Sequence, residues 1–339
     1  MNIRTLRISA LSLLTAAVMA LASCGSDSKK ADATSAEGTK GSGFRVDGSK
    51  LIDANGNEFV MRGVNHAHCW YRGNDDAALK AISETGSNTV RLVLADGEQW
   101  QKDTPQTVKA LIDKCRANKL IAVLEVHDAT GKDSVESLEK ARDFWINVKD
   151  SLKGNEDIAI LNIANEWMAS SSASKWAYGY SAVIPKLREA GIKNTIMVDS
   201  PGWGQAGTAV TEAGVQIFES DPDRNTMFSV HMYGTAGRNS QTIENNLKGS
   251  TEKSLCMIVG EFGHKHSDGN VDEEYILKYC KENNIGCLGW SWKGNSGGVE
   301  YLDISEDWDG KHLSGDWGEV LVNSENGIRA TSKPCSVFS

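Results

Sequence analysis

Eight short apolar runs recur along the chain, and amphipathic segments with helical periodicity separate them. The runs cover 59–65, 89–94, 120–127, 158–166, 195–199, 227–233, 257–262 and 286–292. The helical segments cover 75–85, 105–118, 134–152, 174–190, 208–219, 240–248 and 271–283, and a last helix is predicted after Asp316. Strands that are apolar throughout are typical of a parallel sheet covered by helices on its faces. Eight such units in about 250 residues predict an α/β fold, the (β/α)₈ or TIM barrel.

A short β-hairpin is predicted ahead of these units. The turn signals Asp47-Gly48 and Asn55-Gly56 flank short apolar segments that begin at Phe44. Such pairs favour the tight turns that join antiparallel strands. An open, doubly wound sheet in two halves is the competing fold for the rest of the chain. The number of runs and the lack of an internal linker favour the barrel.

The first 23 residues have the features of a secretory signal peptide. Arg4 and Arg7 give a positive start, and Ile8–Ala20 is mostly apolar but too short for a confident membrane span. The stretch ends in LASC, which resembles a bacterial lipobox, so we expect Cys24 to become a lipid anchor. The alternative is ordinary signal-peptidase cleavage, which would leave Cys24 as a spare thiol on a secreted protein.

The segment 24–43 combines the lipid-anchor cysteine with a flexible linker rich in Ser, Gly and Ala. The remaining 44–339 is predicted to be one globular domain. Acyl chains anchor a protein without spanning the bilayer. We therefore expect export to the cell surface or the outer membrane, with the lipid as the only membrane contact.

Composition narrows the classes of partner. Acidic residues outnumber basic ones by 45 to 36, which gives a net charge of −9. Because phosphate binding needs a basic face, we expect no nucleic-acid partner. A hydrophobic content of 40% excludes a mainly disordered chain.

Six cysteines lie within 44–339. Export would permit disulfides, and a bridge among Cys256, Cys280 and Cys287, all near predicted strand starts, is one reading. Free buried thiols are the other.

Each of the eight predicted strands carries a chemically active side chain at or near its carboxyl end. In chain order these are Asn65 with His66 and His68, Arg91, His127 with Asp128, Asn165 with Glu166, Asp199, His231 with Tyr233, Glu261, and Trp290 with Trp292. In a parallel barrel these ends meet at the mouth that carries active sites. A single polar strand end is usually only solvated, but eight together predict a functional site.

Tryptophans follow the same pattern. Of the 10 in the chain, only Trp145 and Trp176 fall in predicted helices, whereas the others, including Trp203, lie at strand ends or in the following loops. Aromatic side chains gathered at one mouth suit a ligand with flat apolar faces. A sugar ring has such faces, and its hydroxyls would meet the nearby polar groups.

Glu166 and Glu261 end the fourth and seventh predicted strands, roughly opposite each other across the barrel. Glycoside hydrolysis uses two such carboxyl groups, one protonated to release the leaving oxygen and one ionised to attack the anomeric carbon. A cation such as Arg91 would favour the ionised form of the second. Either glutamate alone would be explained more readily as a strand-end ion pair. The two together, under a tryptophan-lined mouth, indicate catalysis.

Two further motifs carry less weight. The stretch 202–207 matches GxGxxG, but it follows the fifth strand and places Trp203 between two glycines, which is unsuited to a pyrophosphate. The pairs His66/His68 and His264/His266 have spacings that can bind metal, but no HExxH or acidic loop accompanies them. We expect no cofactor and no catalytic metal, while a structural calcium stays open.

An ordered set of motifs resembles glycoside hydrolase family 5. The set is VNHAH at 64–68, NTVRL at 88–92, VHD at 126–128, NEW at 165–167, HMY at 231–233, GEFG at 260–263 and GWSW at 289–292. The segments SPGWGQ at 200–205 and VEYLD at 299–303 resemble the bacterial endo-β-1,4-mannanase subfamily. The resemblance runs from about Phe44 to Asp303 and includes all eight strands.

The resemblance implies that 44–339 is a retaining endo-β-1,4-mannanase domain that cleaves mannan, glucomannan or galactomannan by double displacement, and we expect it to be a monomer. It implies that Glu166 is the acid/base, Glu261 the nucleophile, Asn165 the ligand of the sugar 2-hydroxyl and Trp292 the stacking floor, with Arg91, His127, His231 and Tyr233 around the same subsite and Trp203 in a further one. A cellulase of the same family is the nearest alternative. A non-catalytic glycan-binding lipoprotein is the alternative from another class.

Overall fold

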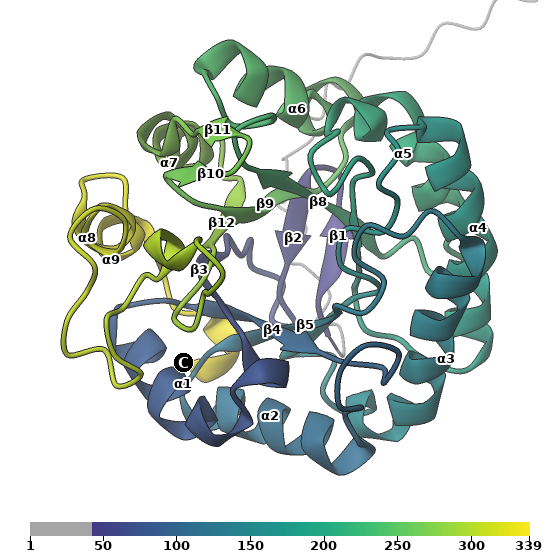
Figure 1. Cartoon of the computed structure of the whole chain (residues 1–339). Helices are drawn as coiled ribbons and strands as arrows, with labels where there is room; N and C mark the ends of the chain where they lie inside the picture. Colours follow the sequence, from purple (N-terminus) through teal and green to yellow (C-terminus); the bar gives the residue numbers. More distant parts are fainter. Residues whose placement is uncertain (1–42) are drawn as a thin grey trace, which may run out of the picture. The chain divides into compact units, whose positions relative to one another are not determined.

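A closed barrel of eight parallel strands forms the centre of the molecule in a computed structural model, which describes residues 43–339 (Figure 1). Neighbouring strands follow the order β12-β3-β4-β5-β6-β7-β8-β9. Their bounds are Arg62–His66 for β3, Thr89–Leu94 for β4, Ile121–Val126 for β5, Ala159–Asn162 for β6, Ile196–Asp199 for β7, Thr226–Met232 for β8, Met257–Phe262 for β9 and Gly286–Gly289 for β12. Every residue of these strands is buried. The predicted TIM barrel is confirmed.

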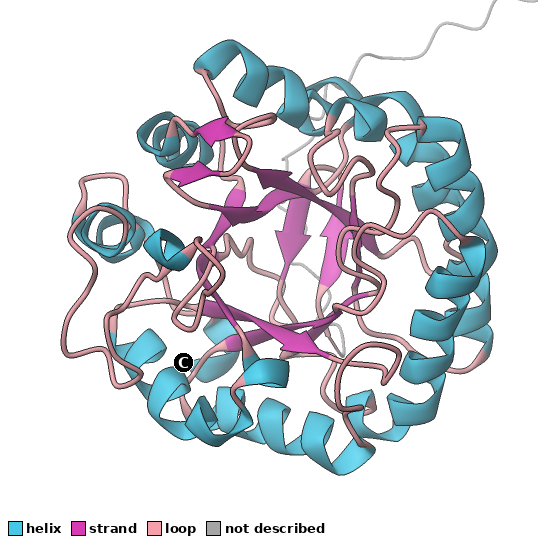
Figure 2. Cartoon of the chain, in the orientation of Figure 1, coloured by secondary structure: helices cyan, strands magenta, loops and turns pink. Residues whose placement is uncertain are grey.

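Helices form the outer layer around this barrel (Figure 2). They are α1 Asp75–Glu84, α2 Pro105–Ala117, α3 Val135–Leu152, α4 Ala173–Glu189, α5 Thr208–Ser220, α6 Ser240–Lys253, α7 Glu273–Glu282, α8 Gly318–Asn323 and α9 Ile328–Thr331. Several start where a polar side chain caps the first turn, as the Thr104 hydroxyl does by accepting the backbone N–H of Thr107. Among the described helices, none is both long and apolar enough to cross a membrane.

Two small antiparallel hairpins complete the described part of the chain. The first pairs β1 (Arg45–Asp47) with β2 (Lys50–Ile52), as predicted. The second pairs β10 (Lys265–His266) with β11 (Gly269–Asn270), directly after β9, and the sequence pattern did not predict it. The predictions for the signal peptide and Cys24, and for the linker up to residue 42, lie outside the described residues.

Two predicted strands are shorter in the structure than their apolar runs. The run 158–166 contributes only Ala159–Asn162 to the barrel, and the run 286–292 contributes only Gly286–Gly289. The residues beyond each strand leave the sheet and enter the loops at the barrel mouth. Alternation of side chains between two faces therefore does not extend to Glu166 or to Trp290 and Trp292.

The six cysteines of the described region are free and buried. Cys280 lies near the end of α7 and Cys287 lies on β12. The structure therefore corresponds to the reading with free buried thiols.

Candidate active site

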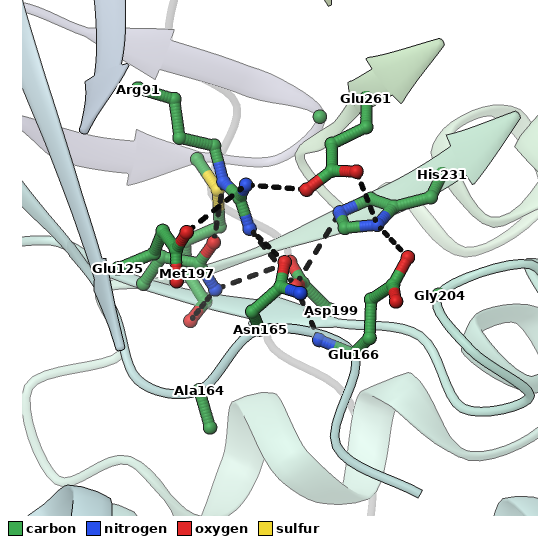
Figure 3. Close-up of polar contacts among 12 residues, drawn as sticks. Arg91, Glu125, Ala164, Asn165, Glu166, Met197, Asp199, Gly204, His231 and Glu261 are labelled. Carbon is green, nitrogen blue, oxygen red and sulfur yellow. Dashed lines mark hydrogen bonds and ion pairs between the residues drawn. The ribbon is translucent and has the colours of Figure 1, made fainter. Parts of the chain in front are cut away.

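Glu166 and Glu261 meet across one imidazole at the carboxyl ends of the strands (Figure 3). His231 Nδ1 lies 2.8 Å from Glu166 Oε1 and 3.5 Å from Glu261 Oε2. One carboxylate oxygen of each glutamate and a nitrogen of His231 all lie within 4.8 Å of one another. Retaining glycosidases hold their carboxyl groups about 5–5.5 Å apart, and inverting ones about 6.5–9.5 Å apart. The geometry matches the retaining class.

A local irregularity of the sheet brings His231 to this position. The register between β8 and β9 shifts between Val230 and His231, so that His231 pairs with Glu261. Bulges of this kind redirect side chains next to active sites. Gly204 supports the arrangement from the loop after β7, because a Cβ atom there would lie 2.6 Å from Cγ of the imidazole.

Glu261 lies in a pocket of hydrogen-bond donors and is 3% exposed. Arg91 Nη1 donates to Glu261 Oε1 at 2.7 Å, and the Tyr233 hydroxyl donates to Oε2 at 2.8 Å. Burial raises the pKa of the Glu261 carboxyl and Glu166 adds to the rise, whereas His231 and Arg91 oppose it. Burial and the neighbouring carboxylate therefore disfavour the ionised form of Glu261, and its cationic neighbours favour it.

Arg91 is the buried centre of the network beneath the pair. Its guanidinium donates to five side chains, namely Asn65, Asn162, Asn165, Asp199 and Glu261. Burial disfavours the charge, but the surrounding carboxylates more than compensate and raise the pKa of Arg91. Its bond to Asn165 Oδ1 is 2.7 Å long, and Asn165 Nδ2 donates to the Thr130 hydroxyl. The amide is thereby fixed at the cavity wall.

His231 lies among three carboxylates, those of Glu166, Asp199 and Glu261. Burial lowers the pKa of an imidazole, but the charges of Glu261 and Asp199, with the hydrogen bond to Glu166, raise the pKa of His231 to about 10. Glu166, His231 and Glu261 have a spacing that could hold a metal ion. A doubly protonated imidazole offers no lone pair, and Arg91 already binds Glu261. The cluster therefore suits proton transfer better than metal binding.

The candidate catalytic pair opens into a cavity of about 310 Å³. Its lining consists of His127, Asn165, Glu166, Trp203, Gln205, Tyr233, Glu261, His266, Ser267, Asp268 and Trp290. A second hollow, lined by Trp70, Tyr71 and Asn295 among others, also has Trp290 in its wall. The cavity that holds the two carboxylates is called the cleft below. A larger cavity of about 500 Å³, bordered by Asp53 and Arg62, includes none of the site residues discussed above.

The structure brings together all but one of the predicted site residues. Arg91, His127, Asn165, His231 and Tyr233 surround the two glutamates. Trp203 is 49% exposed on the cleft wall, where its ring packs so tightly on Gly131 that a Cβ at that glycine would lie 2.1 Å from the indole.

Trp292 is the exception, and its predicted place as the stacking floor is wrong. Its side chain is fully buried, and its indole N–H donates to the carbonyl of Trp308 at 3.1 Å. Trp290 lines the cavity instead and stacks on His127, with ring centroids 5.8 Å apart. The prediction failed because it took 286–292 as one strand with Trp292 at its mouth end, whereas β12 ends at Gly289 and both indoles lie in the loop beyond it. The Trp290–Ser291 peptide bond is cis.

Two buried carboxylates of the site were missed or left without a role by sequence reasoning. Glu125 on β5 is fully buried and lies 2.8 Å from His127 Nδ1. Burial disfavours the imidazolium, but Glu125 raises the pKa of His127. Asp199 was recognised only as a polar strand end. The signal for Glu125 was an acid inside an otherwise apolar run, which requires a buried partner.

A parallel barrel that holds two carboxyl groups at retaining distance, under an aromatic cleft, defines a glycoside hydrolase. Comparison with known proteins specifies the family. The family model described as cellulase (glycosyl hydrolase family 5) matches residues 52–296. The chain therefore belongs to glycosyl hydrolase family 5.

Individual relatives are similar over most of their length. A mannan endo-1,4-beta-mannosidase of Salipaludibacillus agaradhaerens is 52% identical over 297 residues, which cover 88% of this chain and 96% of the relative. One of Streptomyces lividans is 43% identical over 301 residues, covering 87% and 78%. The solved mannohexaose complex of Thermomonospora fusca beta-mannanase is 41% identical with a TM-score of 0.82, covering 88% of this chain and 99% of that one.

Proposed function

We propose that this protein is a retaining endo-β-1,4-mannanase in which Glu166 is the acid/base and Glu261 the nucleophile. The observation that carries the proposal is the pair of carboxylates within 4.8 Å across His231. The substrate class rests on the identity with mannanases across almost the whole barrel. The substrates are β-mannan and its glucose- or galactose-containing forms.

In the first step Glu261 attacks the anomeric carbon while Glu166 protonates the departing glycosidic oxygen. Arg91 and Tyr233 donate to both oxygens of Glu261 and so favour its ionised form before attack. Glu166 lines the cavity and keeps 12% of its side chain exposed, which leaves it accessible to the leaving group. Trp290 supplies the apolar face beneath the sugar, and Asn165 lies where it can bind the 2-hydroxyl.

In the second step Glu166 acts as a base. It removes a proton from water, which attacks the anomeric carbon and releases Glu261 as a carboxylate. Once Glu261 is esterified its charge has gone, so ionisation of Glu166 no longer meets like-charge repulsion. His231 bonds to Glu166 at 2.8 Å and stabilises that ionised form.

The protein acts on polysaccharide outside the cell, attached through Cys24. The signal-peptide pattern, the LASC motif and the linker composition support this location. Radiolabelled palmitate should enter the wild-type protein and fail to enter Cys24→Ala. Labelling of that variant would instead indicate a different site of attachment.

Product release tests the activity and the substrate together. The wild type, Glu261→Ala and Glu282→Ala are compared on β-1,4-mannan and β-1,4-glucan; Glu282 is an exposed glutamate paired with Lys278 on α7 and serves as the matched control. Oligosaccharides from mannan, lost only in Glu261→Ala, are expected. Products from glucan alone would assign the enzyme to the cellulase alternative. Binding without products would overturn the enzymatic proposal.

A further inference from the structure

Asp199 is buried beneath the catalytic pair and contacts both halves of its acid/base machinery. It ends β7 and is fully buried. Its Oδ2 accepts the backbone N–H of Glu166 at 3.0 Å and lies 3.4 Å from His231 Nε2. In Figure 3 dashed lines join Asp199 to the imidazole of His231 and to the backbone nitrogen of Glu166. No motif used to recognise the family includes this residue.

The hydrogen bond from Glu166 to Asp199 holds the backbone of Glu166 in a constrained conformation. Glu166 has a φ of 44°, in the left-handed region that a residue with a side chain rarely adopts. Such a conformation persists only where surrounding interactions over-determine it. Asp199 supplies one from below through the Glu166 N–H, and the Glu166 carbonyl accepts from Gly131 N at 3.1 Å. The direction of the Glu166 side chain therefore depends on the Asp199 carboxylate.

The contact between Asp199 and His231 affects the carboxylate of Glu166, because His231 binds that carboxylate. His231 Nδ1 donates to the Glu166 carboxylate at 2.8 Å only while that nitrogen carries its proton. Asp199 is one of the two charges that most favour the imidazolium. The carboxylate is itself kept ionised, because His231 and Arg91 hold the pKa of Asp199 well below its usual range although burial opposes this. Arg91 Nη2 and Asn162 Nδ2, both at 3.2 Å, hold the Asp199 carboxylate in place.

We infer that Asp199 is a positioning residue for the acid/base: it fixes Glu166 through the backbone N–H and, through His231, at the carboxyl group. This inference rests on the proposed roles of Glu166 and Glu261. It assigns Asp199 to proton transfer rather than to general support of the barrel. The consequence is a dependence on the leaving group, because a sugar needs a proton to depart and dinitrophenolate does not.

The test compares kcat/KM, which reports the glycosylation step, on mannohexaose and on a dinitrophenyl β-mannobioside. Asp199→Ala removes both contacts. Asp199→Asn keeps an acceptor for the Glu166 N–H but loses the charge that favours protonated His231. General acid catalysis contributes about 10²–10⁴-fold. We expect Asp199→Ala to lose about 10²-fold or more on mannohexaose and less than about tenfold on the aryl substrate. Asp199→Asn should show the same preference with a smaller loss.

Asp221→Asn is the matched control. Asp221 is also a buried aspartate that binds an arginine, Arg188, but at the opposite end of the barrel. It should lower thermal stability and change both kcat/KM values by the same factor. Equal losses on the two substrates in the folded Asp199 variants would overturn the inference and leave Asp199 as structural support. Wild-type cleavage of mannohexaose is measured in the same series, so a failure of the mannanase proposal would be seen separately.

Discussion

Two buried arginines mark the two ends of the barrel, and their surroundings differ in kind. Arg188, near the end of α4, binds both oxygens of Asp221 at 2.9 Å and spends its other N–H groups on the carbonyls of Ile192, Asn194 and Asn225. Arg91 donates to side chains only, and two of them, Asp199 and Glu261, are carboxylates; Glu125 adds a third at 3.8 Å.

The difference separates a structural cluster from a reactive one. At Arg188 one charge meets one buried counter-charge, Asp221, in a bidentate pair. The exposed Asp223 lies 3.6 Å away, and backbone carbonyls complete the arrangement. At Arg91 acids outnumber the arginine, and although burial opposes a charge on either imidazole, these acids raise the pKa of His231 and of His127. Excess charge that can be rearranged by moving protons is what an active site requires.

The largest effect is expected from substitution of Glu261, the proposed nucleophile in the cluster around Arg91. Glu261→Ala should reduce turnover by about 10⁴-fold or more, because the variant lacks the carboxylate that forms the covalent intermediate. Stability should change little, since the change also removes like-charge repulsion from Glu166. Rates on mannohexaose and thermal unfolding of the same sample check both statements. Retention of a tenth of the wild-type rate would exclude Glu261 as nucleophile.

Replacing each arginine by methionine tests directly whether its cluster serves catalysis or only stability. Both changes strand buried carboxylates, so each should lower the free energy of unfolding by about 3–5 kcal/mol. Arg91→Met should also reduce kcat/KM by about 10²–10³-fold, as expected for a lost preorganised donor. Arg188→Met should leave the rate per folded molecule unchanged. Denaturant titrations and rates normalised to folded protein provide the measurement. A similar rate loss in both variants would contradict the distinction.

The two tryptophans after β12 differ in the same way: Trp290 is expected to act in function and Trp292 in stability. The expected effect on the rate is smaller than for Arg91. Trp290→Ala should lower kcat/KM by roughly 10- to 100-fold with little loss of stability, because the indole faces the cleft. Trp292→Ala should cost about 3–5 kcal/mol of stability, since its side chain is fully buried. Calorimetry measures the stability of both variants, and kinetics on mannohexaose measures their kcat/KM. The reverse pattern would restore Trp292 as the stacking floor.

The two clusters should also differ in the pH dependence of stability. The pKa of His231 is raised to about 10 from an ordinary 6.5, so its contribution to stability is complete below pH 6.5 and is lost as the pH rises through about 10. The pKa of Asp221 is lowered by Arg188, although burial opposes this, so its contribution is lost as the pH falls below the ordinary carboxyl range.

Unfolding free energies test this difference when they are measured from below the ordinary aspartate pKa of about 3.9 up to a pH of about 10. His231→Asn should flatten the alkaline side of the curve, and Asp221→Asn should flatten the acid side. An unchanged alkaline slope in His231→Asn would mean that the imidazole is neutral in the folded protein.

Periodicity was enough to predict the barrel. The runs 89–94 and 257–262 match β4 and β9 residue for residue, because strands buried on both faces leave a continuous apolar signal. The strand-end rule then located Glu166, Glu261, Arg91, His127 and His231. These side chains meet because a parallel barrel gathers all its carboxyl ends at one mouth.

What the sequence could not provide was the path of the chain after a strand ends. The inversion of Trp290 and Trp292, the hairpin of β10 and β11 and the left-handed turn at Glu166 all follow from loop geometry that periodicity does not encode. Asp199 was visible as a residue, but its contacts with Glu166 and His231 depend on that geometry. The fold and the charged residues were therefore predictable, and their hydrogen-bond partners were not.

The anomeric configuration of the first product tests the central claim most directly. Proton NMR during the first minutes of mannohexaose hydrolysis distinguishes the two anomers before mutarotation equilibrates them. Two carboxylates within 4.8 Å predict that the β-anomer appears first, by double displacement. An initial α-anomer would show single displacement by water, and would contradict the assignment of Glu261 as a covalent nucleophile.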